Sequence, residues 1–559
     1  MITKEKMDRV WLSSYPKGVN ADIDPLQYSS LVGIFDNSVK KYASLPAFTN
    51  FGHSLTYREL EQKTRLLAAY FQSVPNLSKG DRIAIMMPNL LQNPVTIFAA
   101  LRAGFTVVNI NPLYTARELH HQLKDSGAKS IIVLENFAHT VQNAMQGTDI
   151  EHVIISKFGD LLPPPKGILI NFFIKYVKRM VPSHSLLKTI SFKKALLTGA
   201  KLTFSPVPLT HNDIAFLQYT GGTTGVAKGA ILTHKNMVAN MLQALEWIKN
   251  DITLGKETII TALPLYHIFS LTANALVFME AGANNVLITN PRDFKGFVKE
   301  LKNTHFTAIT GVNTLFNSLI NTQGFRDIDF SSLKISLGGG MAVQPVVAAQ
   351  WKKLTGCTLI EAFGLTETSP AVCINPLNIK EYNGSIGLPI SSTYCQIVNP
   401  AGHVVPSGVA GELCVKGPQV MRGYWNRPDE TNNVLSTDGW LKTGDIAKMD
   451  DNGFFYIIDR IKDMILVSGF NVYPNEVESV MTEHPAVLEC GVIGVHDINS
   501  GEAVKAFVVK KDASLTEADL LRYCKERLAA YKMPSHIIFI QTLPKTNVGK
   551  VLRRELKSL

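Results

Sequence analysis

The chain has 559 residues, of which 46% are hydrophobic and 18% are charged. At roughly 150 residues per domain, this length predicts about three or four folding units. The composition excludes a largely disordered protein and a small disulfide-stabilised scaffold. The net charge of +10 favours anionic partners such as phosphates, nucleotides or an anionic membrane, although solubility alone also explains it.

The six cysteines include no CxxC pair, which argues against a zinc ribbon or a dithiol redox site and fits a reducing compartment. Residues 1–16 lack the run of roughly seven apolar residues of a signal peptide. No segment approaches the roughly 18 apolar residues that span a bilayer. We therefore expect a cytoplasmic protein, either soluble or bound peripherally to a membrane.

The N-terminal part of the chain alternates between helical and strand patterns. Capping-box spacings at Thr56/Glu59 and at Thr115/Glu118 each precede an apolar-periodic run. The neighbouring predicted elements are strands at 82–87, 106–110 and 131–134 and a helix at 90–101. Strands separated by helices favour a layered α/β unit with a mainly parallel sheet.

Residues 167–181, GILINFFIKYVKRMV, form a short amphipathic pattern. One helical face has a polar character, carrying Asn171, Lys175, Lys178 and Arg179. The segment is too short to span a bilayer, and its cations favour the interface of an anionic membrane. The alternative is a core helix whose inward residues are Ile170, Phe173 and Val177.

From about residue 460 the pattern becomes that of a small α+β unit. The predicted elements are a helix starting at Pro474, strands near 487–495, 503–510 and 536–541, and a helix at 516–530. About one hundred residues is an ordinary domain size. We therefore divide the chain into a large N-terminal domain, 1–460, and a small C-terminal domain, 461–559.

The segment with the clearest chemical signature is 219–230, YTGGTTGVAKGA. Its glycines let backbone N–H groups approach an anion, and its hydroxyls and lysine suit phosphate oxygens. It is not a Walker A loop, because Lys228 is preceded by Ala227 and followed by Gly229. On composition alone, a mobile turn is the alternative interpretation.

Three further segments fit a nucleotide site. In ISLGGGMAV, the glycines at 338–340 follow a short apolar strand and would let a flat ring approach the backbone. In EAFGLTETSP, Thr366 offers a hydroxyl for phosphate and Glu367 a hard oxygen for Mg²⁺. In LKTGDIA, Asp445 is suited to accept bonds from two ribose hydroxyls. For each segment alone, a tight turn or a solvated acid is the alternative.

Taken together and in order, six segments resemble the core motifs of the adenylate-forming superfamily of acyl-CoA synthetases, luciferases and peptide-synthetase adenylation domains. They are YTGGTTGVAKGA, ALPLYHIFSL, EAFGLTETSP, LKTGDIA, DRIKDMILVSGFNVYPNEVE and LPKTNVGKVLRREL. The resemblance covers nearly the whole chain. Segments such as NPLYTARELHHQL, ITGVNTLFNSL and GELCVKGPQVMRGYW resemble more specifically those of the bacterial long-chain fatty acid:CoA ligases. We expect an α/β fold with a large layered N-terminal domain of mostly parallel sheets, joined by a hinge to a small α+β domain.

The resemblance also implies nucleotide and CoA contacts. The phosphate loop would comprise Tyr219, Thr220, Gly221, Gly222, Thr223, Thr224, Gly225 and Lys228. The adenine site would comprise Gly339, Gly340, Ala362, Phe363 and Gly364. Many relatives have Tyr where this chain has Phe363, so ring stacking is kept and a phenol contact is lost. Asp445 and Arg460 would serve the ribose, and the turn of Ser468, Gly469 and Phe470 would face the CoA tunnel.

Five residues receive catalytic roles through the same resemblance. Thr366 would contact the α-phosphate, and Glu367 would hold Mg²⁺. His267 would lie near the acyl carboxylate, Lys462 would be the hinge, and Lys550 would be the catalytic lysine of adenylation. The residues expected to line or border an acyl tunnel are Phe269, Leu271, Asn313, Thr314 and Phe316.

The activity so implied is ATP-dependent activation of long-chain fatty acids to acyl-CoA through an acyl-adenylate, with Mg²⁺ as cofactor and ATP and CoA as co-substrates. No nucleic acid is expected as a partner, while an anionic inner membrane and a homodimer are left open. One alternative is a ligase that transfers the acyl group to a carrier protein. Another is a nucleotide-regulated fatty acid binding or membrane-docking protein without turnover. Luciferase chemistry is compatible with the motifs, although nothing in the chain favours it.

Overall fold

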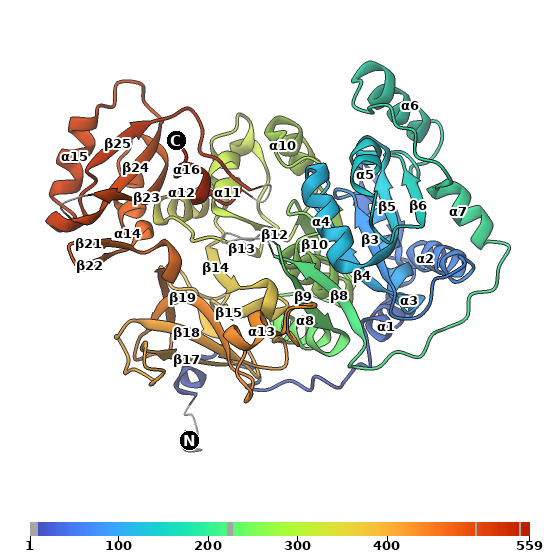
Figure 1. Cartoon of the computed structure of the whole chain (residues 1–559), viewed down its shortest axis with the longest axis horizontal. Coiled ribbons are helices and arrows are strands. Elements are labelled where there is room, and N and C mark those ends of the chain that lie inside the picture. Colours follow the sequence, from blue (N-terminus) through green and yellow to red (C-terminus); the bar gives the residue numbers. More distant parts are fainter. Residues whose placement is uncertain (1–8, 221–226, 498–499, 547–548) are drawn as a thin grey trace.

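The computed structural model describes residues 9–220, 227–497, 500–546 and 549–559, and within these the strands form four sheets (Figure 1). The first sheet has the order β7-β6-β5-β3-β4-β8-β9. Its strands are β3 Arg82–Met86, β4 Thr106–Asn109, β5 Ala128–Leu134, β6 His152–Ser156, β7 Thr189–Ser191, β8 Ile214–Tyr219 and β9 Gly229–Thr233. All neighbouring pairs are parallel except β8 and β9, so the predicted parallel arrangement is confirmed here.

The helices beside this sheet begin where the capping patterns predicted. Thr56 and Thr115 both form complete capping boxes with the glutamate three residues later. The helices are α2 Tyr57–Gln72, α3 Gln92–Arg102, α4 Ala116–Ser126, α5 Ala138–Ala144 and α7 Phe192–Gly199. The local sequence therefore defines the starts of α2 and α4 without tertiary information.

The second sheet has nine strands, in the order β16-β15-β14-β13-β12-β10-β11-β1-β2. The strands are β1 Pro46–Asn50, β2 His53–Thr56, β10 Thr258–Thr261, β11 Asn284–Leu287, β12 Ala308–Gly311, β13 Ile335–Gly339, β14 Leu359–Gly364, β15 Ala371–Ile374 and β16 Leu388–Pro389. Its centre is parallel and its two ends are antiparallel. The parallel strands β12, β13 and β14 therefore end at one edge, where the glycines predicted for the adenine site lie.

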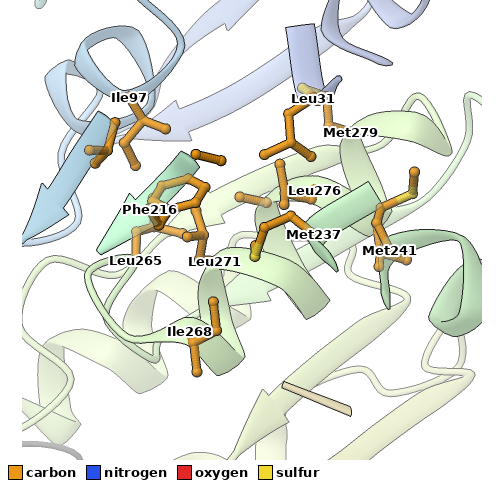
Figure 2. Packing of buried hydrophobic residues seen from close by; sticks show 14 of the residues in the cluster. Leu31, Ile97, Phe216, Met237, Met241, Leu265, Ile268, Leu271, Leu276 and Met279 are labelled. Carbon is orange, nitrogen blue, oxygen red and sulfur yellow. The ribbon is translucent and has the colours of Figure 1, made fainter. Parts of the chain in front are cut away.

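Helices join the first two sheets through a buried apolar cluster. They include α1 Leu31–Tyr42, α8 His234–Ile248, the π-helical η4 Ser270–Leu276 and α9 Val277–Glu280. Figure 2 shows Leu31, Phe216, Met237 and Leu276 converging from α1, β8, α8 and η4, and all four are fully buried. Burial of each such side chain stabilises the folded state by about 1.5–3 kcal/mol. On the second sheet lie α10 Phe294–Lys302, α11 Asn313–Ile320 and α12 Pro345–Thr355.

The third sheet, β17-β18-β19-β20, is antiparallel throughout. Its strands are β17 Tyr394–Val398, β18 Gly411–Lys416, β19 Leu441–Met449 and β20 Phe455–Arg460, with α13 Pro428–Val434 between β18 and β19. The expectation of mostly parallel sheets does not extend to it. A tight turn with Gly453 at φ 82° joins β19 directly to β20, and antiparallel strands need no crossover helix.

The fourth sheet belongs to the small C-terminal domain. Its strands are β21 Ile465–Val467, β22 Phe470–Val472, β23 Val487–Asp497, β24 Gly501–Lys510 and β25 His536–Phe539, in the order β22-β21-β24-β23 with β25 paired to β24. The helices of this part of the chain are α14 Pro474–Thr482, α15 Glu517–Lys525 and α16 Arg553–Leu556. The α+β prediction is confirmed, although α15 ends at Lys525 and not at residue 530.

The amphipathic segment forms α6 Lys166–Phe172 followed by a π-helical turn, η3 Phe173–Val177. In Figure 1, α6 lies at the outer edge of the molecule, beyond β6. The core-helix alternative is wrong for Phe173 and Val177, which are 47% and 57% exposed; only Ile170 packs against the core. Among the described residues, no helix combines the length and hydropathy needed to cross a bilayer.

Candidate active site

Lys550 is buried among charged groups that come from distant parts of the chain. Burial lowers the pKa of its ammonium to about 8, with a further lowering by Arg460 and Lys462 and an opposing effect of Asp445 and Glu367. The neighbouring carboxylates favour the charged form of this lysine, while burial disfavours it. The structure therefore places the lysine of the C-terminal domain against groups of the third sheet and of the loop after β14.

Asp445 and Arg460 are register partners on β19 and β20. The Arg460 Nε atom lies 3.1 Å from Asp445 Oδ1, and Asp445 is only 3% exposed. Burial raises the pKa of Asp445, while Arg460 and Lys550 oppose the rise. Its Oδ2 atom is buried without a hydrogen-bond partner among the described residues. A buried acceptor without a partner suits a ligand hydroxyl.

Thr366 and Glu367 begin the 3-10 turn η6 Thr366–Thr368 after β14. The Tyr424 hydroxyl donates to Glu367 Oε1 at 2.7 Å, and the Met421 N–H donates to the Glu367 carbonyl at 2.8 Å. The first bond holds the carboxylate, and the second holds the backbone of Glu367. Within the described residues there is no cluster of three or more acidic, His or Cys side chains that could hold a metal. Glu367 is thus a single carboxylate, and Mg²⁺ sites built with one or two carboxylates are completed by substrate phosphates and water.

The phosphate-loop residues that the structure describes flank the loop where β8 and β9 meet. The Thr220 N–H donates to the Lys228 carbonyl at 2.9 Å, and Tyr219 donates its hydroxyl to Asp125 at 2.6 Å. Lys228 Nζ lies 2.7 Å from Glu430, so a phosphate would compete with Glu430 for this cation. The candidates Gly221, Gly222, Thr223, Thr224 and Gly225 lie outside the described residues.

The candidate adenine residues lie side by side at the ends of β13 and β14, where Gly339 pairs with Ala362. A Cβ at position 339 would lie 3.0 Å from the Phe269 ring and 3.2 Å from the Ala362 carbonyl oxygen. Gly364 lies directly against the Pro370 carbonyl. Packing therefore restricts position 364 to glycine, whereas a side chain at position 339 would require a small shift of its neighbours. Phe363 is partly buried beside them.

His267 lies close enough to Lys550 for the lysine charge to affect the pKa of the imidazole. Burial first, and then Lys550, lower the pKa of the imidazole to about 4. Its Nδ1 atom accepts a long hydrogen bond from the Phe269 N–H at 3.4 Å. The ring is therefore neutral near pH 7, and its Nε2 atom carries the proton.

Lys462 lies in the short turn η7 Ile461–Asp463, directly after the third sheet. Burial and the nearby Arg460 lower the pKa of Lys462. The turn of Ser468, Gly469 and Phe470 lies elsewhere: Ser468 bonds Ser500 at 2.7 Å, and Phe470 stacks on Tyr531. The structure thus gathers Lys550, Asp445, Arg460, Glu367, Lys462 and His267, and it does not bring the 468–470 turn among them.

Several contact residues of this site were not identified from the sequence. Tyr424 holds Glu367, Glu430 pairs with Lys228, and Arg427 bonds Asp125 at 2.8 Å. Tyr424 lies within GELCVKGPQVMRGYW, a segment used above for the resemblance but given no site role. The polar run that continues from it, NRPDE, is the only local signal for Arg427 and Glu430.

Residues 35–425 match the family of AMP-binding enzymes, and residues 476–550 match the AMP-binding enzyme C-terminal domain. The chain belongs to this adenylate-forming family. It is 56% identical over 551 residues to a long-chain-fatty-acid–CoA ligase of Escherichia coli O6:H1, covering 99% of this chain and 98% of the relative. A Haemophilus influenzae protein of the same name is 50% identical over 99% and 98% of the two chains. These relatives place the chain with the bacterial long-chain-fatty-acid–CoA ligases.

A solved structure supports the fold independently. The structure of the anthranilate CoA ligase AuaEII in complex with anthranoyl-AMP has a TM-score of 0.84 to this chain, with 24% identity, and covers 96% of this chain and 98% of its own. At this level of identity the likeness concerns the fold. The large N-terminal and small C-terminal arrangement is therefore shared with an adenylate-forming enzyme.

Proposed function

We propose that this chain activates long-chain fatty acids to acyl-CoA through an acyl-adenylate, consuming ATP and releasing pyrophosphate and AMP. The observation that carries the proposal is the burial of Lys550 among Asp445, Arg460 and Glu367. Adenylation needs a cation at such a place, because a carboxylate must approach a polyanion. The names of the full-length relatives support the long-chain acyl substrate. The product would enter fatty acid degradation and lipid metabolism.

In the first half-reaction, a carboxylate oxygen of the fatty acid attacks the α-phosphorus and pyrophosphate leaves. Lys550 would contact both reacting partners, Thr366 the α-phosphate, and Lys228 the outer phosphates after leaving Glu430. Asp445 would hold the ribose through its free Oδ2 atom. Neutral His267 would donate its Nε2–H near the acyl group without adding charge.

Glu367 would hold Mg²⁺, which when bound offsets negative charge on the phosphates. The bond from Tyr424 leaves the second carboxylate oxygen of Glu367 for this task. One carboxylate plus phosphate oxygens is a common Mg²⁺ environment. Tyr424 would therefore orient the carboxylate before the nucleotide arrives.

In the second half-reaction, the CoA thiolate attacks the acyl carbonyl, the thioester bond forms, and AMP leaves with the electrons of the broken C–O bond. Lys550 occupies the site in the present arrangement, so this step requires that the small domain rotate. We place the domain boundary between residues 460 and 461 and the pivot at Lys462, within the short turn η7. The turn of Ser468–Phe470 would then face CoA.

We also propose that the protein works at the cytoplasmic face of an anionic membrane, docked through α6 and η3. The helix contacts the protein by its polar side: Asn171 accepts a bond from the Gly159 N–H at 2.8 Å, and Lys175 pairs with Glu135 at 2.8 Å. The apolar side is turned outward. Its large side chains are 47–63% exposed and comprise Ile168, Leu169, Phe172, Phe173, Tyr176, Val177 and Met180. A contiguous apolar helix face flanked by cations suits an interfacial location.

The test of the ligase activity is pyrophosphate release from ATP across fatty acids of increasing length, with and without CoA. We expect release that requires a long-chain acid, and acyl-CoA formation when CoA is present. Release that ignores CoA, without thioester, would favour a carrier-protein acceptor. Absence of release with every acid would contradict the proposed function.

A further inference from the structure

Thr314 makes a contact that its predicted place in the acyl tunnel does not explain. It is the second residue of α11 and follows the carboxyl end of β12. Its hydroxyl donates to the carbonyl oxygen of Gly549 at 3.3 Å, across 235 positions of the chain. Gly549 directly precedes Lys550. The contact therefore joins the N-terminal domain to the backbone of the catalytic-lysine candidate.

Lys550 and Gly549 belong to one tight hairpin, so they move together. Lys545 and Val551 form an antiparallel bridge at its base. The Thr546 N–H donates to the Lys550 carbonyl at 2.7 Å, and the Thr546 hydroxyl accepts from the Lys550 N–H at 3.0 Å. A displacement of the Gly549 carbonyl would therefore displace Lys550 as well.

The surface that receives the hairpin is fixed. Asn313, next to Thr314, accepts a hydrogen bond from the Gln344 N–H at 2.9 Å, and both Asn313 and Val312 are buried. Gly549 approaches this surface closely, because a Cβ there would collide with the Thr314 hydroxyl and lie 3.2 Å from Val312 Cγ2. Its φ of 84° also favours glycine.

We propose that Thr314 is a positioning residue for Lys550: its hydroxyl docks the hairpin through Gly549 and so holds Lys550 in the adenylating arrangement. This inference rests on the proposed function. When the small domain rotates for the CoA step, Gly549 leaves with Lys550 and the bond is broken. Thr314 therefore stabilises one arrangement of the domains only, and its loss affects one half-reaction.

The experiment measures both half-reactions in Thr314→Val, with Thr314→Ser as the matched control that keeps the hydroxyl. Adenylation is followed as acid-dependent ATP–pyrophosphate exchange, and the CoA step as thioester formation from supplied acyl-AMP. We expect Thr314→Val to lower the exchange kcat by about 2- to 10-fold, the range of one lost hydrogen bond. The CoA step should be unchanged or faster, and Thr314→Ser should restore exchange.

A second pair of variants tests the contact from the other side. Gly549→Ala should reduce exchange by roughly tenfold or more, through the collision and the positive φ. In a Thr314→Ala background, Gly549→Ala should reduce exchange by a smaller factor, because the collision with the Thr314 hydroxyl is absent. The double-mutant cycle would measure this coupling between the two positions.

A tunnel role gives a different pattern. If Thr314 only lined the acyl tunnel, Thr314→Val would change the KM for fatty acids in a chain-length-dependent way. Three results would overturn the inference, provided that the wild-type protein is active. They are this chain-length dependence, an equal loss in both half-reactions, and the absence of coupling between Thr314 and Gly549→Ala. If the wild-type protein showed no acid-dependent exchange, the proposed function would fail and this inference with it.

Discussion

Lys550 combines burial with proximity to two carboxylates, and we expect it to act in one half-reaction only. Lys550→Ala should lower acyl-AMP formation by roughly 10²- to 10³-fold, the usual effect of removing one preorganised electrostatic group. Conversion of supplied acyl-AMP and CoA to thioester should be retained, because in the proposed mechanism the lysine leaves the site for that step. Stopped assays of each half-reaction test this, and equal loss of both would refute the division of labour.

Glu361 is a buried carboxyl within β14, the strand that also carries the candidate adenine residues Ala362 and Phe363. Burial raises its pKa to about 8, although hydrogen bonds from Tyr382 and the Val343 N–H oppose the rise. Since the unfolded value is about 4.3, the folded chain binds the extra proton between these values, and stability should fall as pH rises from about 5 to 8. Glu361→Gln removes this ionisation and should flatten the fall.

The measurement for Glu361 is the thermal unfolding midpoint at several pH values between 5 and 8. Glu483→Gln, at an exposed position at the end of α14, is the matched control and should follow the wild-type curve. A Glu361→Gln curve that also follows the wild type would contradict the assignment.

At the scale of single elements, α6 and η3 expose an apolar face. Replacing Ile168, Leu169 and Phe172 with serine should weaken binding to vesicles rich in anionic lipid by about tenfold or more, because each side chain loses apolar burial. Changing Lys178 and Arg179 to glutamate should weaken binding to anionic vesicles specifically. Lys175 is left unchanged because it pairs with Glu135.

Co-sedimentation with anionic and with neutral vesicles separates these effects. Val404→Ser and Val409→Ser remove apolar side chains that are exposed on the third-sheet side of the molecule, and they should leave binding unchanged. Unchanged binding of the α6 variants would exclude this helix as the docking surface.

At the scale of the whole molecule, the proposed connection between the domains is the short turn at Lys462. Arg553, in the last helix, lies 3.4 Å from Asp459 and 3.1 Å from Asp463, which lie on either side of Lys462 in the sequence. Lys462→Pro should fix the local φ and keep the adenylating arrangement. We expect nearly normal pyrophosphate exchange and a roughly 10²-fold slower CoA step.

Lys462→Ala is the control for this variant, because it removes the charge and leaves φ free. The two half-reactions should both persist in it. Unimpaired thioester formation by Lys462→Pro would exclude Lys462 as the pivot. The pivot would then have to be another residue of the 459–464 segment.

Much of the fold follows from local sequence. Thr56 and Thr115 fix helix starts through short-range hydrogen bonds, and the apolar runs at β3 and β5 predict buried strands, because period and capping depend on neighbouring residues only. The third sheet was not predicted, since its antiparallel strands are not separated by the helices that marked the first sheet, and the segments before and after β18 carry little periodic signal.

The sequence by itself determined the motifs, their order and the chemistry they suit. Only the tertiary structure decided that the polar face of α6 turns inward and its apolar face outward, because periodicity shows that two faces differ and not which one meets solvent. It likewise decided that Thr314 meets Gly549. Contacts between residues 235 positions apart depend on how the two domains dock, which no local pattern encodes.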